Sequence, residues 1–466
     1  MKNNNGKPFI IILLAVLLLA GLSFAPWSRL TDGKIKDFNL IGDILKNKKT
    51  DVVTATEQID PELEAALTDN SKNAMPLSSE EKGETFTASD TMPSKPKPAV
   101  NPRVGDVVII EDYTADGTGL KNLKTALANR ASRPARIAVI GDSYIEGDIL
   151  TMNVREALQN KYGGCGVGFI PLSSPLTGFR TSVRHTCSGW TVHDMRKKSE
   201  PAYKWLAGEW CTASAGAKST FKGVKNLAHL ADWQSTQLLY VSPADGNIKV
   251  TIGDETKLYP VKSGKEVQAI SINRNINNIG IETDINGLQA LGIWLDGNSG
   301  ICVDNMSLRG NSGISHRFLD NNLCAQMNKY IKYDCIIVEY GINALSSQQS
   351  NYNGYANLMT KVIAKLRQCY PGADIIMMGI GDRGQKYDGV VSSLPTAVNM
   401  VDAQRSVARK TGVLFWDTRE AMGGENAVVT WRNDGLINAD YIHLNAKGGA
   451  RLSKLFVRAL EKSLDQ

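Results

Sequence analysis

The chain has 466 residues, of which 42% are hydrophobic and 21% are charged, and these proportions are ordinary for a globular protein with a sizeable core. The net charge of +6 comes from scattered basic residues, so nothing in the charge pattern indicates nucleic-acid binding. The seven cysteines form no CxxC or His–Cys cluster, which argues against a zinc site, and no metal or cofactor is expected. Cys187 and Cys211 lie in a loop-rich region and are candidates for a disulfide.

The N-terminus predicts a membrane anchor. Lys2 and Lys7 precede an apolar run over residues 8–25, and eighteen helical residues span roughly 27 Å, close to the thickness of a bilayer core. The basic flank favours the cytoplasm, which places the rest of the chain on the periplasmic, extracytoplasmic side of the inner membrane. A cleaved signal peptide is the alternative, but Pro26 directly after the candidate cleavage site disfavours it. We therefore expect residues 1–27 to be a cytoplasmic tail and a single transmembrane helix.

A polar segment follows this anchor. Residues 46–105 are rich in Lys, Glu, Asp, Ser, Thr and Pro and contain few large apolar side chains. Such a composition cannot bury enough apolar surface to form a core. We expect residues 28–105 to be a flexible linker between the membrane and the globular part.

The globular part begins and ends with an α/β pattern. Short apolar runs predict buried strands at residues 137–140, 335–338, 375–378 and 413–416. Helical patterns lie between or after them, at residues 355–366, 396–409 and from 446 onward. Alternating strands and helices predict a parallel sheet covered on both faces. This α/β domain is expected to comprise residues 106–180 and 301–466.

The middle of the chain, residues 181–300, differs from both flanks. Short strand patterns separated by turn residues occur at 238–241, 248–252, 267–272, 279–283 and 291–295. This pattern is typical of a β-sandwich. Because one α/β strand precedes the segment and the others follow it, we expect a β-sandwich inserted in the α/β domain.

Three residues carry the candidate chemistry. Ser143 directly follows the first predicted strand, at the edge of the sheet where ligands bind in open α/β folds. A serine hydroxyl becomes an effective nucleophile when a histidine, itself oriented by a carboxylate, accepts its proton. Of the five histidines, only His443 has an Asp three residues before it, Asp440, in a short loop that enters a helix. The alternative, non-catalytic interpretation is that Ser143 is a helix N-cap and that Asp440 and His443 form a surface turn.

The motifs resemble those of SGNH hydrolases of the GDSL type. Three of the four family blocks occur in order: Gly141-Asp142-Ser143, Gly341-Ile342-Asn343 and Asp440-x-x-His443. The resemblance implies a flavodoxin-like parallel sheet, a Ser143–His443–Asp440 triad, and an oxyanion hole that uses the Ser143 backbone N–H and the Asn343 amide. The fourth block supplies a glycine N–H. By analogy this is Gly310, with Gly163 or Gly164 as the alternative.

The inserted β-domain narrows the resemblance to peptidoglycan O-acetylesterases and related O-acetyltransferases. It implies a serine esterase that removes O-acetyl groups from a cell-envelope glycan, with acetylated polysaccharide as the partner molecule. One alternative is acetyl transfer onto the glycan, with a membrane partner delivering the acetyl group. Another is a catalytically inactive glycan-binding protein. The sequence departs from the common motifs at Tyr144, after the serine, and at Ala344, where an acidic residue often follows the asparagine.

Overall fold

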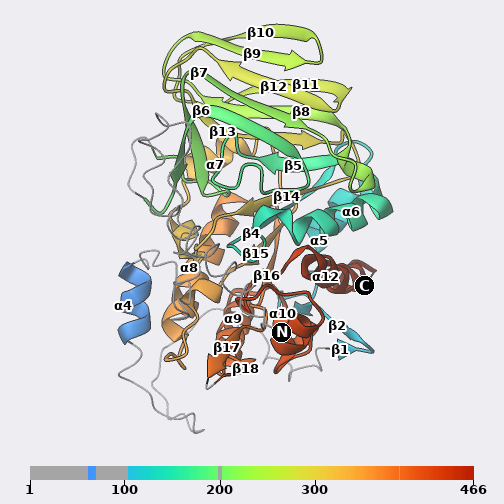
Figure 1. Cartoon of the computed structure of the whole chain (residues 1–466), viewed down its shortest axis with the longest axis vertical. Coiled ribbons are helices and arrows are strands. Elements are labelled where there is room, and N and C mark those ends of the chain that lie inside the picture. Colours follow the sequence, from blue (N-terminus) through green and yellow to red (C-terminus); the bar gives the residue numbers. More distant parts are fainter. Residues whose placement is uncertain (1–60, 70–102, 198–201, 388, 466) are drawn as a thin grey trace, which may run out of the picture. The chain divides into compact units, whose positions relative to one another are not determined.

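The computed structural model describes residues 61–69, 103–197, 202–387 and 389–465 (Figure 1). The predicted anchor and nearly all of the predicted linker, residues 1–60 and 70–102, lie outside the described residues. Among the residues described, no helix is both long and apolar enough to cross a membrane.

A six-stranded sheet with five parallel strands forms the centre of the α/β domain. Its sixth strand pairs antiparallel at one edge. In spatial order the strands are β14 (Ile301–Ser307), β4 (Ala135–Gly141), β15 (Cys335–Glu339), β16 (Asp374–Met378), β19 (Leu414–Trp416) and the antiparallel β3 (Glu111–Asp112). The parallel strands are buried almost throughout, as expected for strands covered on both faces. The predicted parallel sheet is therefore confirmed.

Helices cover the two faces of this sheet, with α6 and α12 on one side and α8 and α9 on the other (Figure 1). The main helices are α5 (Lys121–Ala128), α6 (Thr151–Tyr162), α7 (Asn321–Met327), α8 (Asn353–Cys369), α9 (Ala397–Thr411) and α12 (Ala446–Asp465). The other α-helices described are α4 (Pro61–Asp69), α10 (Thr418–Met422) and α11 (Ala427–Asn433). Helix α12 buries Leu452, Phe456 and Leu460 along one stripe, the spacing of an amphipathic helix. Its Gly449 allows close packing, because an added Cβ would lie 2.3 Å from the backbone oxygen of Ile149.

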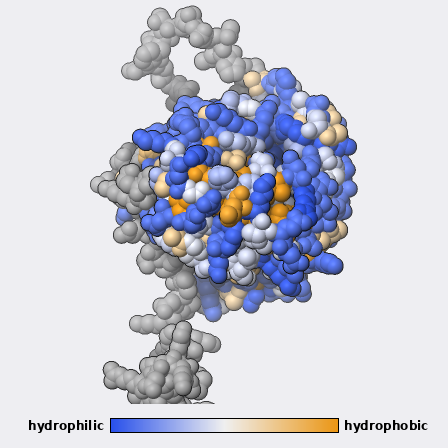
Figure 2. Space-filling view, turned by 90° about the horizontal axis from the view of Figure 1, so that it is seen from above, coloured by the Kyte–Doolittle hydropathy of each residue, from blue (hydrophilic) through white to orange (hydrophobic). Residues whose placement is uncertain are grey.

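The inserted segment forms an antiparallel β domain, as expected. Hydrogen bonds join its strands into one nine-stranded sheet instead of two separate ones. The strands are β5 (Gly166–Ile170), β6 (Arg184–Asp194), β7 (Glu209–Lys222), β8 (Trp233–Val241), β9 (Gly246–Ile252), β10 (Glu255–Val261), β11 (Gln268–Ile276), β12 (Asn278–Thr283) and β13 (Gln289–Asp296). Strand β5 precedes the predicted start of the insert at residue 181 and joins this sheet by pairing with β13. Their inward side chains, among them Phe221, Trp233 and Ile281, form a core separate from that of the α/β domain. Figure 2 views the β domain from the top of Figure 1, and the surface there is mainly hydrophilic around a small hydrophobic area.

A buried polar cluster joins the β domain to the α/β domain. Arg136 of β4 forms ion pairs with Asp296 of β13 and Asp304 of β14, at 2.7 and 3.1 Å. Asp304 also accepts hydrogen bonds from the Trp294 indole and from the backbone N–H of Phe169, both at 3.0 Å. Because each of these side chains is buried and forms at least one ion pair or hydrogen bond, the cluster favours one arrangement of the two domains.

The candidate disulfide between Cys187 and Cys211 is not formed, since all seven cysteines are free thiols. In the β6–β7 ladder Cys187 lies opposite Ser219, whereas Cys211 lies opposite Val192. The two cysteines are thus not partners across the strands. Instead, the Cys187 thiol donates to the Ser173 hydroxyl at 3.3 Å, and the Cys211 thiol donates to the Ser173 carbonyl at 3.2 Å.

Candidate active site

The turn that carries Ser143 lies at the carboxyl edge of the parallel sheet. Strand β4 ends at Gly141, and the neighbouring strands β14 and β15 place Ser307 and Glu339 beside that glycine. The loops that follow all three strands therefore meet around Ser143. An added Cβ at Gly141 would lie 2.8 Å from both the backbone oxygen and a carboxylate oxygen of Glu339, so this crowded position requires glycine.

The structure brings Ser143, His443 and Asp440 into one hydrogen-bonded chain. The Ser143 Oγ lies 2.9 Å from His443 Nε2, and His443 Nδ1 lies 2.7 Å from Asp440 Oδ2. The other oxygen of Asp440 accepts hydrogen bonds from the backbone N–H groups of Ile442 and His443. Tyr441 adopts a left-handed conformation, with φ of 59°, in the tight turn that makes these contacts.

Asp440 is ionised at neutral pH. Its partial burial would raise its pKa, but hydrogen bonds from the His443 ring and from two backbone N–H groups hold the pKa at about 2. A carboxylate at Nδ1 keeps the proton on that nitrogen, which leaves Nε2 free to accept the proton of Ser143. The arrangement can therefore activate a serine nucleophile.

Gly310 lies in a tight turn directly beside the nucleophile strand. The turn spans Leu308 to Asn311, closed by a hydrogen bond from the Asn311 N–H to the Leu308 carbonyl, with Gly310 at its third position and φ of 72°. This conformation favours glycine. The Leu308 N–H donates to the Gly141 carbonyl at 2.9 Å, so the turn is fixed two residues from Ser143.

The alternative glycines, Gly163 and Gly164, lie at the opposite edge of the sheet. The Gly163 carbonyl accepts from the N–H of Ile301, the first residue of β14, whereas Ser307 at the other end of β14 lies beside Gly141. The six residue-to-residue steps from Ile301 to Ser307 separate the two ends by about 20 Å. Neither glycine can reach Ser143, and this alternative is wrong.

Asn343 follows β15 in a short 3-10 turn and is held by two acceptors. Its amide donates to Asp142 Oδ2 at 2.9 Å and to the backbone oxygen of Asn311 at 3.2 Å. Asp142 is fully buried and also accepts from the N–H of Tyr144. Burial raises the pKa of Asp142 to about 7. The role of Asp142 in holding Asn343 was not predicted, although Asp142 stands inside the Gly141-Asp142-Ser143 motif.

A buried ion cluster holds the segment that follows the nucleophile. Asp148, another non-glycine residue with positive φ, receives two hydrogen bonds from Arg155 and one each from Arg180 and Ser182. Burial alone would raise the pKa of Asp148, but the two guanidinium groups keep it below its usual value. The cluster ties the nucleophile turn to α6 and to the loop of residues 171–183. Sequence spacing gave no signal for it.

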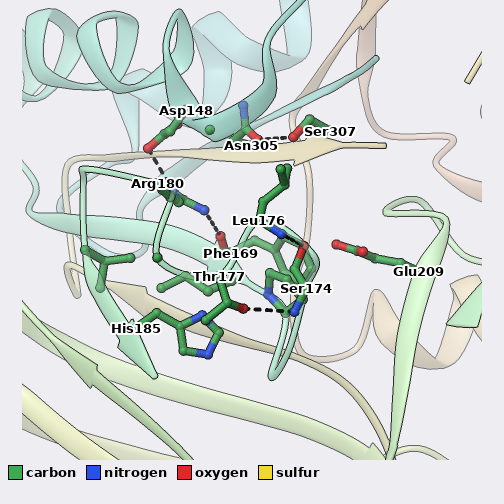
Figure 3. A pocket seen from close by; sticks show the side chains of 15 residues that line it. Asp148, Phe169, Ser174, Leu176, Thr177, Arg180, His185, Glu209, Asn305 and Ser307 are labelled. Atoms are coloured by element: carbon green, nitrogen blue, oxygen red, sulfur yellow. Dashed lines mark hydrogen bonds and ion pairs between the residues drawn. The ribbon is translucent and has the colours of Figure 1, made fainter. Parts of the chain in front are cut away.

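A pocket opens beside this cluster, between the nucleophile turn and the β domain (Figure 3). It encloses about 490 Å³, including the solvent at its mouth. Gly147 and Ser307 line it on the α/β side, and Leu176, Thr177 and Glu209 line it on the side of the β domain. It therefore begins at residues adjacent to the Ser143 turn.

Comparison with known proteins supports the assignment of the fold. Residues 290–451 match the GDSL-like Lipase/Acylhydrolase family. The chain carries a GDSL-like acylhydrolase domain. The protein is thus a carboxylic ester hydrolase. The matched range contains Asn343, Asp440 and His443, while Ser143 joins this acylhydrolase domain through the pairing of β4 with β14 and β15.

One solved structure shows a similar fold over most of this chain. A peptidoglycan O-acetylesterase matches with a TM-score of 0.63 and 21% identity, over 76% of this chain and 99% of that chain. A family two carbohydrate esterase from Cellvibrio japonicus matches with a TM-score of 0.26 and 11% identity, over 61% of this chain and 98% of its own. No curated protein matches the sequence. The acylhydrolase thus resembles peptidoglycan O-acetylesterases in fold.

Proposed function

We propose that this protein is a serine acetylesterase that removes O-acetyl groups from a cell-envelope glycan, and that the glycan is peptidoglycan. The observation that carries the proposal is the chain of hydrogen bonds from Ser143 through His443 to Asp440, at 2.9 and 2.7 Å. These residues are brought together across 300 positions of sequence, at the sheet edge where α/β enzymes bind their ligands.

In the proposed reaction the Ser143 oxygen attacks the ester carbonyl while His443 Nε2 takes its proton. His443 then gives that proton to the departing sugar oxygen, and the C–O bond to the sugar breaks. Water attacks the acetyl-serine, His443 accepts a proton from it, and acetate leaves as the proton returns to Ser143. The N–H groups of Ser143 and Gly310 and the amide of Asn343 are assigned to the oxyanion that develops in each step.

The choice of an acetylated glycan is supported by the fold shared with a peptidoglycan O-acetylesterase, which includes nearly all of that chain. It is further supported by the pocket between the β domain and the nucleophile turn, which is lined by hydroxyl and carboxyl groups suited to a sugar.

The test uses a chromogenic acetyl ester with and without an unacetylated peptidoglycan oligosaccharide, and follows both free acetate and acetylated sugar. We expect rapid release of acetate that the oligosaccharide does not divert. Acetylated sugar formed at the expense of acetate would replace the esterase proposal by an acetyltransferase, which would then require a membrane partner as acetyl donor. Absence of reaction with a serine-directed fluorophosphonate would instead favour a non-catalytic glycan-binding protein.

We also propose that residues 1–27 anchor the enzyme in the inner membrane, with its catalytic domain in the periplasm. The basis is the apolar run over residues 8–25 and the basic residues before it. The full-length protein should sediment with membranes and resist extraction by alkaline carbonate, and protease added outside the inner membrane should digest its catalytic domain. Release of the protein in soluble form with a new N-terminus after residue 25 would show a cleaved signal peptide instead.

A further inference from the structure

An ion pair joins the turn that carries Gly310 to the segment that follows the nucleophile. Arg309, directly before Gly310, donates through its Nη2 to Oε1 of Glu146, which lies three residues after Ser143. We propose that Arg309 and Glu146 are positioning residues, which together hold the backbone N–H of Gly310 toward the oxyanion. This inference rests on the proposed function, because that function assigns the Gly310 N–H to the oxyanion hole.

The Gly310 N–H is a donor whose direction depends on the conformation of the turn. Among the described residues this N–H has no acceptor. It belongs to the peptide bond between Arg309 and Gly310, which is the central peptide of the turn. Arg309 has a negative φ and Gly310 has a φ of 72°, the combination of a type II turn. In a type I turn the same peptide would be turned over, and its N–H would point to the opposite side.

The two ends of the turn are anchored through their backbones. The Leu308 N–H donates to the last residue of β4 at 2.9 Å, and the Asn311 carbonyl accepts from the Asn343 amide at 3.2 Å. Neither contact reaches the central peptide. The ion pair with Glu146 is therefore the contact that anchors the corner of the turn at Arg309.

Glu146 offers Arg309 a firmly held partner. It begins the 3-10 turn that ends at Asp148, the carboxylate at the centre of the buried ion cluster. The carbonyl of Ile145, just before Glu146, accepts from the Asn305 amide of β14 at 2.9 Å. The backbone on both sides of Glu146 is thus fixed to the α/β domain, and Arg309 transmits this fixed position to the Gly310 turn.

The burial of Glu146 favours the ion pair over separated side chains. The Glu146 side chain is only 5% exposed, and its second oxygen, Oε2, is buried with no hydrogen-bond partner among the described residues. A buried carboxylate that loses its cation keeps an uncompensated charge, which is costly. The Arg309 side chain is 59% exposed, so it can be replaced without opening a cavity in the core.

The test measures kcat and KM of the full-length protein on a chromogenic acetyl ester. Arg309→Ala should lower kcat about tenfold and leave KM within about twofold, because a misdirected oxyanion donor weakens binding of the transition state more than that of the substrate. Arg309→Lys should stay within about threefold of the wild type, since a single guanidinium nitrogen contacts Glu146 and an ammonium can replace it. As the matched control, Arg274→Ala breaks another exposed ion pair and should leave kcat unchanged. Melting temperatures check the folding of each variant.

A second series tests whether the two residues act as one unit. Glu146→Ala should lower kcat by about the same factor as Arg309→Ala, and the double variant should lose about tenfold and not about a hundredfold. If the buried Glu146→Ala variant fails to fold, the Arg309 variants still decide the question. The rate at which Ser143 displaces fluoride from a fluorophosphonate gives a readout without an acetyl ester, because the phosphoryl oxygen also occupies the oxyanion hole. This rate should fall in parallel with kcat.

A loss of kcat in Arg309→Ala no larger than that in Arg274→Ala would overturn the proposal, whatever the melting temperature. A rise in KM at constant kcat would also overturn it, since Arg309 would then contact the substrate, and so would losses that multiply in the double variant. If the wild type hydrolyses the ester and the variants match it, the positioning pair fails and the esterase remains. If the wild type hydrolyses no acetyl ester but Arg309→Ala reacts about tenfold more slowly with the fluorophosphonate, the proposed function fails and the positioning pair remains. If the wild type reacts with neither reagent, both proposals fail.

Discussion

Replacing Asp142 by asparagine tests whether this buried acid acts through Asn343. In the wild type, Asp142 Oδ2 accepts from the Asn343 amide at 2.9 Å while Oδ1 accepts from the Tyr144 N–H at 2.9 Å. An asparagine has only one oxygen, so one of these donors must face an NH₂ group. The variant keeps the size of the side chain and changes only its hydrogen bonding.

The size of the expected effect follows from the lost contact. Leaving a buried hydrogen-bond donor without its acceptor costs about 1–3 kcal/mol, and such a loss at Asn343 would disorient an oxyanion donor. Turnover on an acetyl ester should therefore fall about 10- to 100-fold. Asn343→Ala, which removes the donor itself, should cost about 10²–10³-fold. To bind the oxyanion, the Asn343 amide must release its longer bond, 3.2 Å to the Asn311 carbonyl.

The assay is a double-mutant cycle on kcat and kcat/KM with a chromogenic acetyl ester, with circular dichroism as the check on folding. If Asp142 acts through Asn343, Asp142→Asn should have little further effect in an Asn343→Ala background. If the losses of activity in the two single variants multiply in the double variant, or if Asp142→Asn alone keeps full activity, this reasoning is refuted.

The same substitution should change how stability depends on pH. Burial raises the pKa of Asp142 from 3.8 to about 7, so the folded state holds the proton more tightly than the unfolded state. The contribution of protonated Asp142 to the free energy of unfolding is fully present below pH 3.8 and is lost as the pH rises through 7. Asparagine does not titrate, so Asp142→Asn should gain up to about 3 kcal/mol relative to the wild type between pH 5 and 8. A difference in unfolding free energy that does not vary with pH would mean that Asp142 is ionised throughout.

Three further substitutions test catalysis and packing. Ser143→Ala should lower acetyl-ester turnover by about 10⁴-fold or more. The melting temperature should not change, since among the described residues the Ser143 Oγ forms a hydrogen bond only with His443. Normal turnover of this variant would show that Ser143 is not the nucleophile. Asp148→Asn should cost about 3–5 kcal/mol in unfolding free energy, because it leaves buried guanidinium groups without their carboxylate. As the control, Arg274→Ala breaks an exposed ion pair and should leave the melting temperature unchanged. Gly449→Ala should destabilise the fold by about 1–3 kcal/mol, because it forces α12 away from the loop after the nucleophile turn. Lys447→Ala, at an exposed position of the same helix, should not destabilise the fold. Equal melting temperatures for these two variants would contradict the close packing at Gly449.

Local sequence determined the features that depend on residue type and short-range pattern. Buried parallel strands such as β4 and β15 contain continuous apolar runs, at residues 137–140 and 335–338, because both of their faces are covered. Asp440 and His443 were identified because their three-residue spacing allows a single turn to bring carboxylate and ring together. Strand β14 was not predicted, since Asp304 and Asn305 interrupt its apolar pattern. These two polar residues are tolerated because each is buried with hydrogen-bond partners.

Only the tertiary structure decided which distant residues share the site. The order of strands places β14 directly beside β4, and this pairing brings the Gly310 turn to Ser143 while it sends Gly163 to the opposite edge. The same sheet brings Asn343 to Asp142, although 201 residues separate them. Sequence periodicity reports which face of a strand is buried, but it carries no information about which strand lies next to it. That choice depends on long-range packing, including the buried polar junction with the β domain, and it is this packing that completes the site.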